Sequence, residues 1–366
     1  PHVNEEVVLI LYGDVPLIRP DTLRELVSRV GDRRLALLTL EMNDPSGYGR
    51  IIRAADGSVQ RIVEQKDATA EELAVGEVNT GILACPRAFL AEVLPALSSN
   101  NAQGEYYLTD VIAMAVQSGL EVDTLQPVHG WEVDGVNDRV QLARLERIFQ
   151  QHQAETLMRA GVSIADPARL DVRGTVQCGI DIELDINVLL IGEVTLGDAV
   201  RIGPHCVIRD TQIAADSVIE AHSLIDGAMI GGGCHVGPFA RLRPGTVLAD
   251  RARIGNFVET KNTRIAEGAK ANHLSYLGDA DIGADSNIGA GTITCNYDGA
   301  NKAPTRIGAR AFIGSNSALV APVTIGADAT VGAGSVITGD VADGQLAVGR
   351  SKQRNISGWQ RPRKKE

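Results

Sequence analysis

The chain has 366 residues, with 35 basic and 46 acidic side chains and a net charge of −11, and at about 150 residues per domain it predicts two or three domains. This acidic balance argues against a general nucleic-acid binder, and the lack of any run of 18 apolar residues predicts no transmembrane helix. Five cysteines without CxxC spacing, and a start unlike a signal peptide, favour a cytoplasmic protein without structural disulfides.

Residues 1–137 alternate between expected strands and helices, which is typical of an α/β domain with a mixed sheet. The segments, in chain order, are VVLILYG as a buried parallel strand, PDTLRELVSRV as a helix, LALLTL as a strand, GRIIRA and SVQRIVEQ as a hairpin, then TGILACP, AFLAEVLPAL and YYLTDVIAMAVQSG. We expect a truncated Rossmann-like domain, because the chain opens on a strand that belongs in the middle of a doubly wound sheet.

Residues 138–160 read as a linker helix that ends near Gly161. Its apolar side chains recur at three- and four-residue steps and predict a packed stripe: Val140, Leu142, Leu145, Ile148 and Phe149. Glycine changes frequency here, with 11 glycines in residues 1–160 and 28 in residues 161–366. A second architecture is therefore expected over residues 161–366.

In that second part a hydrophobic residue recurs at nearly every sixth position. The clearest run is Ile307, Ile313, Leu319, Ile325, Val331 and Ile337. An earlier run, with a few five-residue steps, is Ile191, Leu196, Ile202, Ile208, Ile213, Ile219, Ile225, Ile230, Val236 and Leu242. A period of six indicates a β-helix in which three hexads close each coil. The pattern resembles the left-handed parallel β-helix of the hexapeptide-repeat acyltransferases.

The repeat is interrupted in sequence between Gly255 and Gly278, where His273 stands among polar and small residues. An imidazole titrates near neutrality and suits a general base, although a structural histidine with a hydrogen-bond partner fits the pattern too. Arg243 and Lys261 are cations that suit a phosphate, or are solvated charges. In the first domain, Asp14 ends a strand, where a carboxylate either binds Mg²⁺ beside a nucleotide or caps the following helix.

Longer strings carry a more specific resemblance. PFARLRPG, NFVETK, HLSYLGD, IGAGTITCNYDGANK and IGSNSALVAP resemble the acetyltransferase half of the bacterial bifunctional N-acetylglucosamine-1-phosphate uridyltransferase/glucosamine-1-phosphate acetyltransferase family. LYGDVPL, DPSGYGRI, IVEQKDA, EVNTGI, NNAQGEYYLTD and DGVNDR resemble its uridyltransferase half. The resemblance spans essentially the whole chain.

For the solenoid, the resemblance implies direct acetyl transfer from acetyl-CoA to glucosamine 1-phosphate within a homotrimer whose coenzyme pocket is shared between neighbouring solenoids. His273 matches the base, Arg243 and Lys261 the phosphate ligands, and Tyr276 and Asn287 the sugar contacts. The matches to the acetyl-CoA site are Ala290, Asn296, Tyr297, Ser315, Ala333 and Arg350. The basic tail RPRKKE either attracts coenzyme A phosphates or is a solvated end.

For the first domain, the resemblance implies Mg²⁺-dependent attack of N-acetylglucosamine 1-phosphate on UTP. Asp14 and Asn137 match the metal ligands, and Asn137 also matches a substrate contact. The other matches to substrate contacts are Tyr12, Gly13, Gly49, Glu64 and Asn79. The family's glycine-rich triphosphate loop has no counterpart in this sequence, so we expect acetyl transfer but no uridyl transfer from the chain as given.

Two other functions fit parts of the pattern. Hexapeptide solenoids also hold zinc between coils, and His205 and His222 are expected to stack one coil apart, with His235 out of register for a third ligand. A solenoid that serves only as a trimerisation scaffold is the other alternative. The gathering of Arg243, Lys261, His273 and Tyr276 argues against a scaffold, because a scaffold needs no such cluster.

Overall fold

The computed structural model describes residues 3–361, which form two compact units, Pro1–Phe149 and Gln150–Glu366. The units meet inside one helix, α5 (Arg139–Arg159), in the region expected as a linker. Of the basic tail RPRKKE, only Arg361 lies among the described residues. In residues 3–361 no helix combines the length and apolar character needed to cross a membrane.

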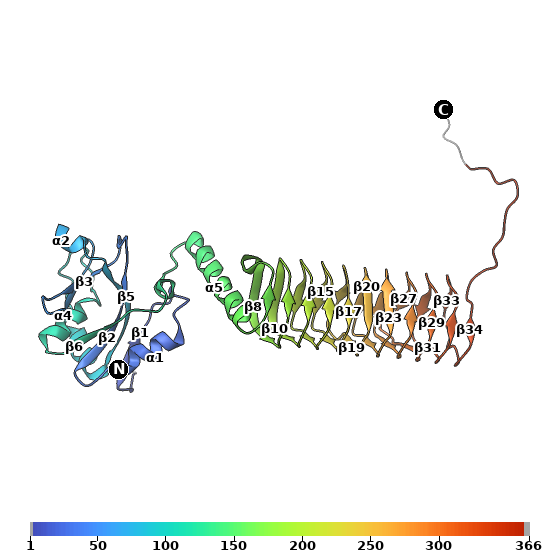
Figure 1. Cartoon of the computed structure of the whole chain (residues 1–366), viewed down its shortest axis with the longest axis horizontal. Helices are drawn as coiled ribbons and strands as arrows, with labels where there is room; N and C mark the ends of the chain where they lie inside the picture. The colour runs from blue at the N-terminus through green and yellow to red at the C-terminus, as the bar shows by residue number, and fades with distance from the viewer. Residues whose placement is uncertain (1–2, 362–366) are drawn as a thin grey trace, which may run out of the picture. The chain divides into compact units, whose positions relative to one another are not determined.

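The first unit is a mixed six-stranded sheet with helices packed on it (Figure 1). Its strands are β1 (Val7–Ile10), β2 (Arg34–Glu41), β3 (Arg50–Arg53), β4 (Val59–Val63), β5 (Glu77–Pro86) and β6 (Glu121–Leu125). Its helices are α1 (Pro20–Ser28), α2 (Ala70–Leu73), α3 (Arg87–Val93) and α4 (Asp110–Gln117), with 3-10 turns at Leu94–Ala96 and Gly130–Val133. The strand order is β4-β3-β5-β2-β6, and β1 pairs with β5.

The central strand β2 packs against a hydrophobic core on each side of the sheet, and this explains the uninterrupted apolar run in its sequence. Leu35 and Leu37 belong to the hydrophobic core on one side of the sheet, and Ala36 and Leu38 to the core on the other. A strand buried on both sides needs no polar alternation. The expectation for VVLI in β1 was wrong, because β1 runs antiparallel to β5 and is only half-buried. A short apolar run does not encode the direction of its partner.

The expected linker helix is present, and it ends just before Gly161, whose φ of +100° is a left-handed conformation that glycine adopts without strain. The predicted packed stripe is wrong at three of its five positions. Leu145 is buried, but Val140, Leu142 and Phe149 are 78%, 52% and 38% exposed. Further along, Ala154 packs into the solenoid core, and Gln150 exchanges hydrogen bonds of 2.9 and 2.7 Å with the backbone of Val172.

The second unit is a β-solenoid with three faces of parallel strands (Figure 1). The first face contains β7 (Ser163–Ile164), β9 (Glu183–Leu184), β11 (Arg201–Ile202), β14 (Val218–Ile219), β17 (His235–Val236), β20 (Arg253–Asn256), β23 (Lys270–His273), β26 (Asn287–Ile288), β29 (Phe312–Ile313), β32 (Thr330–Val331) and β34 (Leu346–Ala347).

The other two faces follow in each coil. The second face contains β12 (Val207–Arg209), β15 (Leu224–Asp226), β18 (Arg241–Leu242), β21 (Glu259–Lys261), β24 (Tyr276–Gly278), β27 (Ile293–Cys295), β30 (Ala318–Val320) and β33 (Val336–Ile337). The third contains β13 (Gln212–Ile213), β16 (Met229–Ile230), β19 (Val247–Leu248), β22 (Arg264–Ile265), β25 (Ala280–Ile282), β28 (Thr305–Ile307) and β31 (Val323–Ile325). The long strands β8 (Leu170–Cys178) and β10 (Val188–Leu196) begin the stack.

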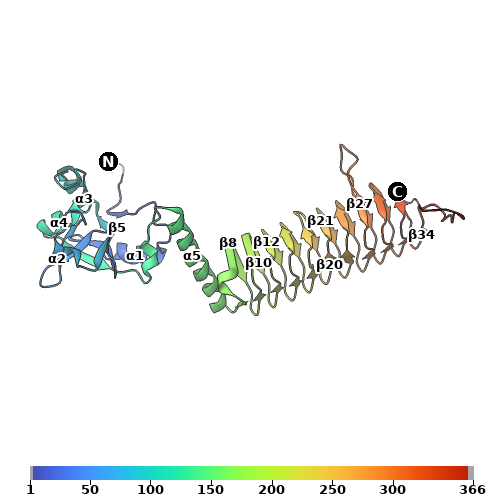
Figure 2. The ribbon, with the colours of Figure 1, turned by 90° about the horizontal axis from the view of Figure 1, so that it is seen from above.

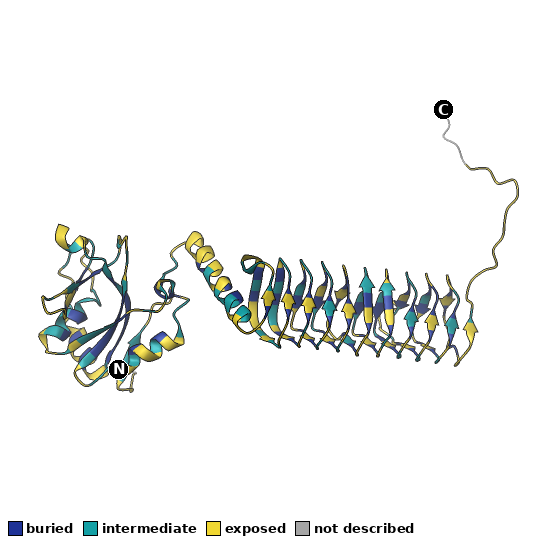
Figure 3. Cartoon of the chain, in the orientation of Figure 1, coloured by how far each residue is buried: buried dark blue, intermediate teal, exposed yellow. Residues whose placement is uncertain are grey.

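The six-residue beat marks the interior of the solenoid, which Figure 3 shows as a buried column. All the predicted core residues from Leu196 to Ile337 are buried, but Ile191 is not, because Leu190 points inward in its place. The interruption seen in sequence is not an interruption of the fold. Thr260 and Ala271 fill inward positions there, and the Thr260 hydroxyl is satisfied by Thr246 at 2.9 Å. The coils are instead interrupted by the loop at residues 296–304, which stands out beside β27 in Figure 2.

Candidate active sites

His273 ends β23 on the first face, and its side chain is exposed. Its Nδ1 lies 2.6 Å from Oδ1 of Asn256, the residue paired with it on the neighbouring coil. An amide oxygen only accepts, so Nδ1 donates this hydrogen bond, and in a neutral ring the lone pair is then on Nε2. Both residues line a hollow of about 530 Å³, together with Phe239, Phe257 and Arg253. The pair therefore has the geometry of an oriented base.

Four of the predicted acetyl-CoA residues continue from His273 along the solenoid. Ala290, Ser315 and Ala333 occupy the same position in successive coils, with hydrogen bonds of 2.8 Å from Asn316 N–H to Ala290 O and from Gly334 N–H to Ser315 O. Arg350 follows, because its guanidinium donates to the carbonyl of Ala333. We call His273, Ala290, Ser315, Ala333 and Arg350 the acetyl row. Asn287, in β26, lies on the same face.

Arg243 and Lys261 meet on the second face and are joined by Lys302, which the sequence reasoning missed. Arg243 N–H donates to Thr260 O at 2.9 Å, which places Arg243 beside Lys261 on the next coil. Contact with the Lys302 ammonium holds the pKa of Lys261 below its ordinary value, burial adds to this, and Asp279 opposes it. We call Arg243, Lys261 and Lys302 the cation group. Three cations at such close range favour an anion between them.

Lys302 reaches this place because the 296–304 loop folds back, with Tyr297 and Lys302 forming a β-bridge. In the sequence, the only sign of this loop is a break in the six-residue repeat. The loop begins beside Asp279, whose carboxylate accepts from Asn296 Nδ2 at 2.6 Å and from Asn262 Nδ2 at 2.7 Å. A hollow of about 390 Å³ opens here, lined by Asn262, Asp279 and Lys302 among others.

Tyr276 belongs with the cation group and not with His273, although only two residues separate them. A Cβ placed on Gly278 would lie 2.5 Å from Tyr276 Oη and 2.7 Å from Asn296 Nδ2, so the ring lies over Gly278 toward the loop. Gly278 is the residue paired with Lys261. Leu274, with φ of +51°, turns the corner between the two faces. One chain therefore presents the acetyl row and the cation group on different faces.

Ring side chains form a ladder along that corner. His205 stacks on His222 at 4.8 Å, His222 on Phe239 at 4.8 Å, and Phe239 on Phe257 at 5.3 Å. The two histidines stack as the sequence spacing predicted. In the described part of the chain no group of three or more His, Cys, Asp or Glu side chains is placed to hold a metal ion.

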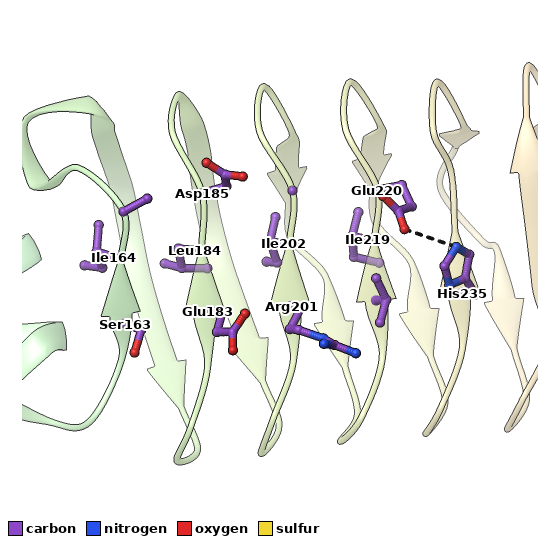
Figure 4. Close-up of a pocket in the computed structure, with 13 residues that line it drawn as sticks. Ser163, Ile164, Glu183, Leu184, Asp185, Arg201, Ile202, Ile219, Glu220 and His235 are labelled. Atoms are coloured by element: carbon purple, nitrogen blue, oxygen red, sulfur yellow. Dashed lines mark ion pairs between the residues drawn. The ribbon is translucent and has the colours of Figure 1, made fainter.

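Another hollow, of about 660 Å³, lies on the first face toward its N-terminal end (Figure 4). Glu183 of β9, Arg201 of β11 and His235 of β17 project there, and His235 Nε2 pairs with Glu220 Oε1 at 3.3 Å. It shares His235 with the hollow beside His273. None of the predicted site residues lines it.

Cysteine supplies no evident nucleophile for an acyl-enzyme. Burial raises the pKa of the thiols of Cys85, Cys178, Cys206 and Cys234 to about 11, so these four stay protonated near neutrality. All five cysteines are free. Acyl transfer through any of those four thiols is therefore disfavoured.

The predicted substrate contacts of the first unit come together around Tyr12. A Cβ on Gly81 would lie 1.7 Å from the Tyr12 ring, so the ring rests on that glycine. Burial, then the carboxylates of Glu64 and Asp14, raise the pKa of Tyr12 above its ordinary value. Gly49 borders Glu64, because a Cβ there would stand 3.3 Å from both carboxylate oxygens.

Hydrogen bonds fix the other members of this group. Asn79 N–H donates to Gly49 O at 2.8 Å, and Asn79 Oδ1 accepts from Gly81 N–H at 3.0 Å. Thr109 Oγ1 donates to Glu64 Oε1 at 3.0 Å. Gly13 lies between Tyr12 and Asp14, and a Cβ on it would meet no heavy atom within 4 Å in the described chain. Strands and helix ends far apart in sequence thus converge on one open surface.

Asp14 and Asn137 are brought close by the backbone. Val136 N–H donates to Asp14 O at 2.8 Å, and a Cβ on Gly135 would stand 3.9 Å from Asp14 Oδ2, so the carboxylate is not covered from that side. Magnesium prefers a few protein oxygens completed by water and phosphate. The expectation that Asp14 ends a strand was wrong, because β1 stops at Ile10 and Asp14 lies in the turn that follows. One carboxylate in this turn and one amide oxygen still fit the requirement of magnesium.

Comparison with known proteins gives two matching family models. The GMPPB C-terminal domain matches residues 172–258, and the hexapeptide repeat of succinyl-transferase matches residues 304–339. Among solved structures, the UDP-N-acetylglucosamine acyltransferase of Francisella novicida is 13% identical, covers 51% of this chain and 66% of its own, and has a TM-score of 0.32. The polySia-specific acetyltransferase NeuO is 18% identical, covers 55% and 83%, and has a TM-score of 0.24.

Curated relatives match over the full chain. The bifunctional protein GlmU of Alcanivorax borkumensis is 66% identical over 364 residues, which is 100% of this chain and 80% of the relative. The protein of the same name from Stutzerimonas stutzeri is 59% identical over 365 residues, 100% of this chain and 81% of the relative. That from Nitrosospira multiformis is 53% identical, with 100% and 80% covered.

Proposed function

The chain belongs to the family of bifunctional GlmU proteins, and from this premise we propose which of its residues carry each of the two transferase activities. The solenoid transfers the acetyl group of acetyl-CoA to the 2-amino group of glucosamine 1-phosphate. The first unit joins N-acetylglucosamine 1-phosphate to UTP with release of pyrophosphate. This proposal replaces the sequence-based expectation of acetyl transfer alone, because relatives that match the full chain at 53–66% identity are named bifunctional. The observation that carries the first assignment is the imidazole of His273, held by Asn256 and followed along the solenoid by a strip of small side chains.

In acetyl transfer, His273 Nε2 takes a proton from the amine as its nitrogen attacks the thioester carbonyl. A C–N bond forms, the C–S bond breaks, and coenzyme A leaves as thiolate, which the imidazolium reprotonates. A positioned base of this kind contributes about 10²- to 10⁴-fold to rate. The small side chains of Ala290, Ser315 and Ala333 leave room for an extended pantetheine arm that leads to Arg350. The raised pKa values of the thiols of Cys85, Cys178, Cys206 and Cys234 support direct transfer that uses none of these four as an acyl carrier.

The cation group binds the phosphate of the sugar. The guanidinium of Arg243 forms an ion pair with the carboxylate of Glu259 at 2.9 Å. The positive charges of Lys261 and Lys302 are therefore the main attraction for the phosphate. Tyr276, Asn296 and Tyr297 border the same place and contact the sugar or the coenzyme. Asn287 approaches from the first face. Fixing the phosphate orients the amine toward the thioester, which makes the reaction effectively intramolecular.

One chain alone presents these two groups on different faces, on either side of the corner at Leu274. We therefore propose that the acetyl row of one copy faces the cation group of the next, and that three copies close the ring as a homotrimer. A closed ring of head-to-tail interfaces gives each copy one partner for each group. Because all five cysteines are free thiols, we also place the enzyme in the reducing cytoplasm.

In uridyl transfer, Glu64 and Asn79 hold the sugar while Tyr12, on Gly81, fixes one side of the nucleotide site. Asp14 and Asn137 would hold Mg²⁺, which neutralises phosphate charge when bound. The convergence of these side chains on one surface supports this assignment.

The test is thiol release from acetyl-CoA by this chain, with and without glucosamine 1-phosphate, alongside molar mass by light scattering. We expect release that depends on the sugar phosphate and the mass of a trimer. A trimer that releases no thiol would overturn the acetyl assignment. Pyrophosphate release from UTP, N-acetylglucosamine 1-phosphate and Mg²⁺, compared with an Asp14→Ala variant, tests the second activity separately.

A further inference from the structure

Two neighbouring strands of the first face differ from the others on that face. β20 and β23 have four residues each, whereas the remaining described strands of the face have two. The added length comes from one extra pair, Asn256 with His273, beyond the pair of Ile254 with Ala271. The backbone therefore holds these two residues against each other at a position where the strands of the other coils have already ended.

Their side chains are also unusual for that position. The corresponding residues in the three preceding coils are Pro204, Ala221 and Pro238, and those in the three following coils are Ala290, Ser315 and Ala333. Asn256 and His273 are thus two long polar side chains side by side in a strip of small or cyclic ones. Their contact of 2.6 Å is a short hydrogen bond.

We propose that Asn256 is a positioning residue for acetyl transfer, an inference that rests on the proposed function of His273. By accepting a hydrogen bond from Nδ1–H, its Oδ1 holds the imidazole in the tautomer whose Nε2 is free to take a proton from the amine. If the amide donated instead, Nε2 would carry the proton and the base would be lost. A neutral amide orients the ring without the charge of a carboxylate, which would keep the ring protonated to higher pH.

The other charged or titratable side chains near this pair are few. His235 of β17 and Arg253 of β20 line the same hollow, and Lys270 begins β23. His235 pairs with Glu220 at 3.3 Å. None of these groups is altered in the variants below, so a change in the pH profile reports on the Asn256–His273 contact.

The experiment measures thiol release across pH for wild type, Asn256→Ala and Asn256→Asp. For Asn256→Ala we expect kcat to fall about tenfold to hundredfold, with KM for both substrates within about twofold, because the ring loses its orientation and not its substrates. For Asn256→Asp we expect the acidic limb of kcat/KM to move to higher pH by about one unit, because a carboxylate favours the charged ring. An unchanged kcat in the first variant, or an unmoved limb in the second, overturns the proposal.

A matched control comes from elsewhere on the solenoid. Asn187 Nδ2 lies 3.5 Å from the ring of His205, so Asn187→Asp places the same charge beside a histidine outside the site. We expect it to leave the pH profile unmoved. If Asn256→Ala does not fold, judged by its melting temperature, Asn256→Asp decides the matter, since it keeps the acceptor oxygen and nearly the same volume.

A spectroscopic readout separates this proposal from the proposed function. With ¹⁵N-labelled histidine, the signal lost in His273→Ala identifies His273. We expect a protonated Nδ1 and an unprotonated Nε2 in wild type, and a mixture of tautomers in Asn256→Ala. A protonated Nε2 in wild type overturns the positioning role. The expected tautomer in a protein that releases no thiol would overturn the acetyl assignment and leave the contact standing.

Discussion

The two units assemble their sites in different ways. In the solenoid, residues that meet in space are separated by nearly one coil in sequence, as Asn256 and His273 are by 17 positions. In the α/β unit, Tyr12 rests on Gly81 and Thr109 bonds to Glu64, across separations that follow no period. In a repeat, the number of residues per coil decides which residues are neighbours in space, whereas in a sheet the order of the strands decides it. Substitutions in the solenoid should therefore act on one row at a time and leave the other unit untouched.

The largest expected effect is on the base. His273→Ala should lower the rate of acetyl transfer by about 10²- to 10⁴-fold, because no other group takes the proton from the amine. Uridyl transfer should stay at the wild-type rate, because the α/β unit has its own core. Thiol and pyrophosphate release measured on the same preparation check both statements. A variant that keeps its full acetyl rate would exclude His273 as the base.

The next effect is on phosphate binding. Lys261→Ala should raise KM for glucosamine 1-phosphate about tenfold to hundredfold, the cost of one charge-assisted hydrogen bond of about 1.5–3 kcal/mol. KM for acetyl-CoA should change less than twofold. Arg310→Ala is the control, since it removes an exposed cation that pairs with Asp328 at 2.7 Å. Equal losses for both substrates would mean that the cation group does not discriminate between them.

In the α/β unit, a change of one methyl group tests whether sheet geometry sets the site. Gly81 has φ of +79° and supports the Tyr12 ring, so Gly81→Ala should displace that ring and reduce uridyl transfer about tenfold. Gly57→Ala is the control, because Gly57 also has a positive φ, +87°, and a Cβ there meets no heavy atom within 4 Å in the described chain. Similar losses in both variants would point to backbone strain alone.

The smallest effect is on the acid stability of the solenoid. Burial raises the pKa of Asp279, but hydrogen bonds from Asn262 and Asn296 and the charges of Lys261 and Lys302 outweigh it and hold the pKa below 3.8. A lowered folded pKa gives stability that is present above the unfolded value and lost as pH falls through the folded one. The melting temperatures of wild type and Asp279→Asn should therefore converge as the pH is lowered from 7 to below 3.8. A constant difference would show that the carboxylate charge adds no stability.

How far the sequence predicted the molecule follows the same division. In the solenoid, the beat of six placed nearly every core residue, and it failed at Ile191, where Leu190 takes the inward position. It also implied a break near His273 that the fold does not have, because Thr260 and Ala271 are small enough to fill inward positions and the Thr260 hydroxyl finds a partner in Thr246. The six-residue period identifies the inward positions that aliphatic side chains fill. It does not show which polar side chains can form a hydrogen bond inside the solenoid and so fill such a position.

In the α/β unit, the lengths of the apolar runs and the positions of glycine turns predicted most strands and helices, but they did not predict which strands pair. The antiparallel course of β1, and the strand β6 that pairs parallel with β2, depend on contacts across the whole unit. The pattern of residues singled out His273, Arg243, Lys261, Tyr276 and Asp14, and family resemblance supplied the other candidate site residues. Lys302 was missed because a lysine in a nine-residue loop carries no local signal, and only the β-bridge with Tyr297 brings it to Lys261.

The most direct measurement is complementation between two impaired variants, assayed at a glucosamine 1-phosphate concentration low enough that the raised KM of Lys261→Ala leaves little activity. His273→Ala and Lys261→Ala chains, separately tagged, are co-expressed and purified as mixed trimers. If the acetyl row of one copy faces the cation group of the next, every mixed trimer has one of its three interfaces with an intact row against an intact cation group, and acetyl transfer returns to about a third of the wild-type rate. A mixed trimer as inactive as either variant alone would place both groups in the same chain's site and contradict the account.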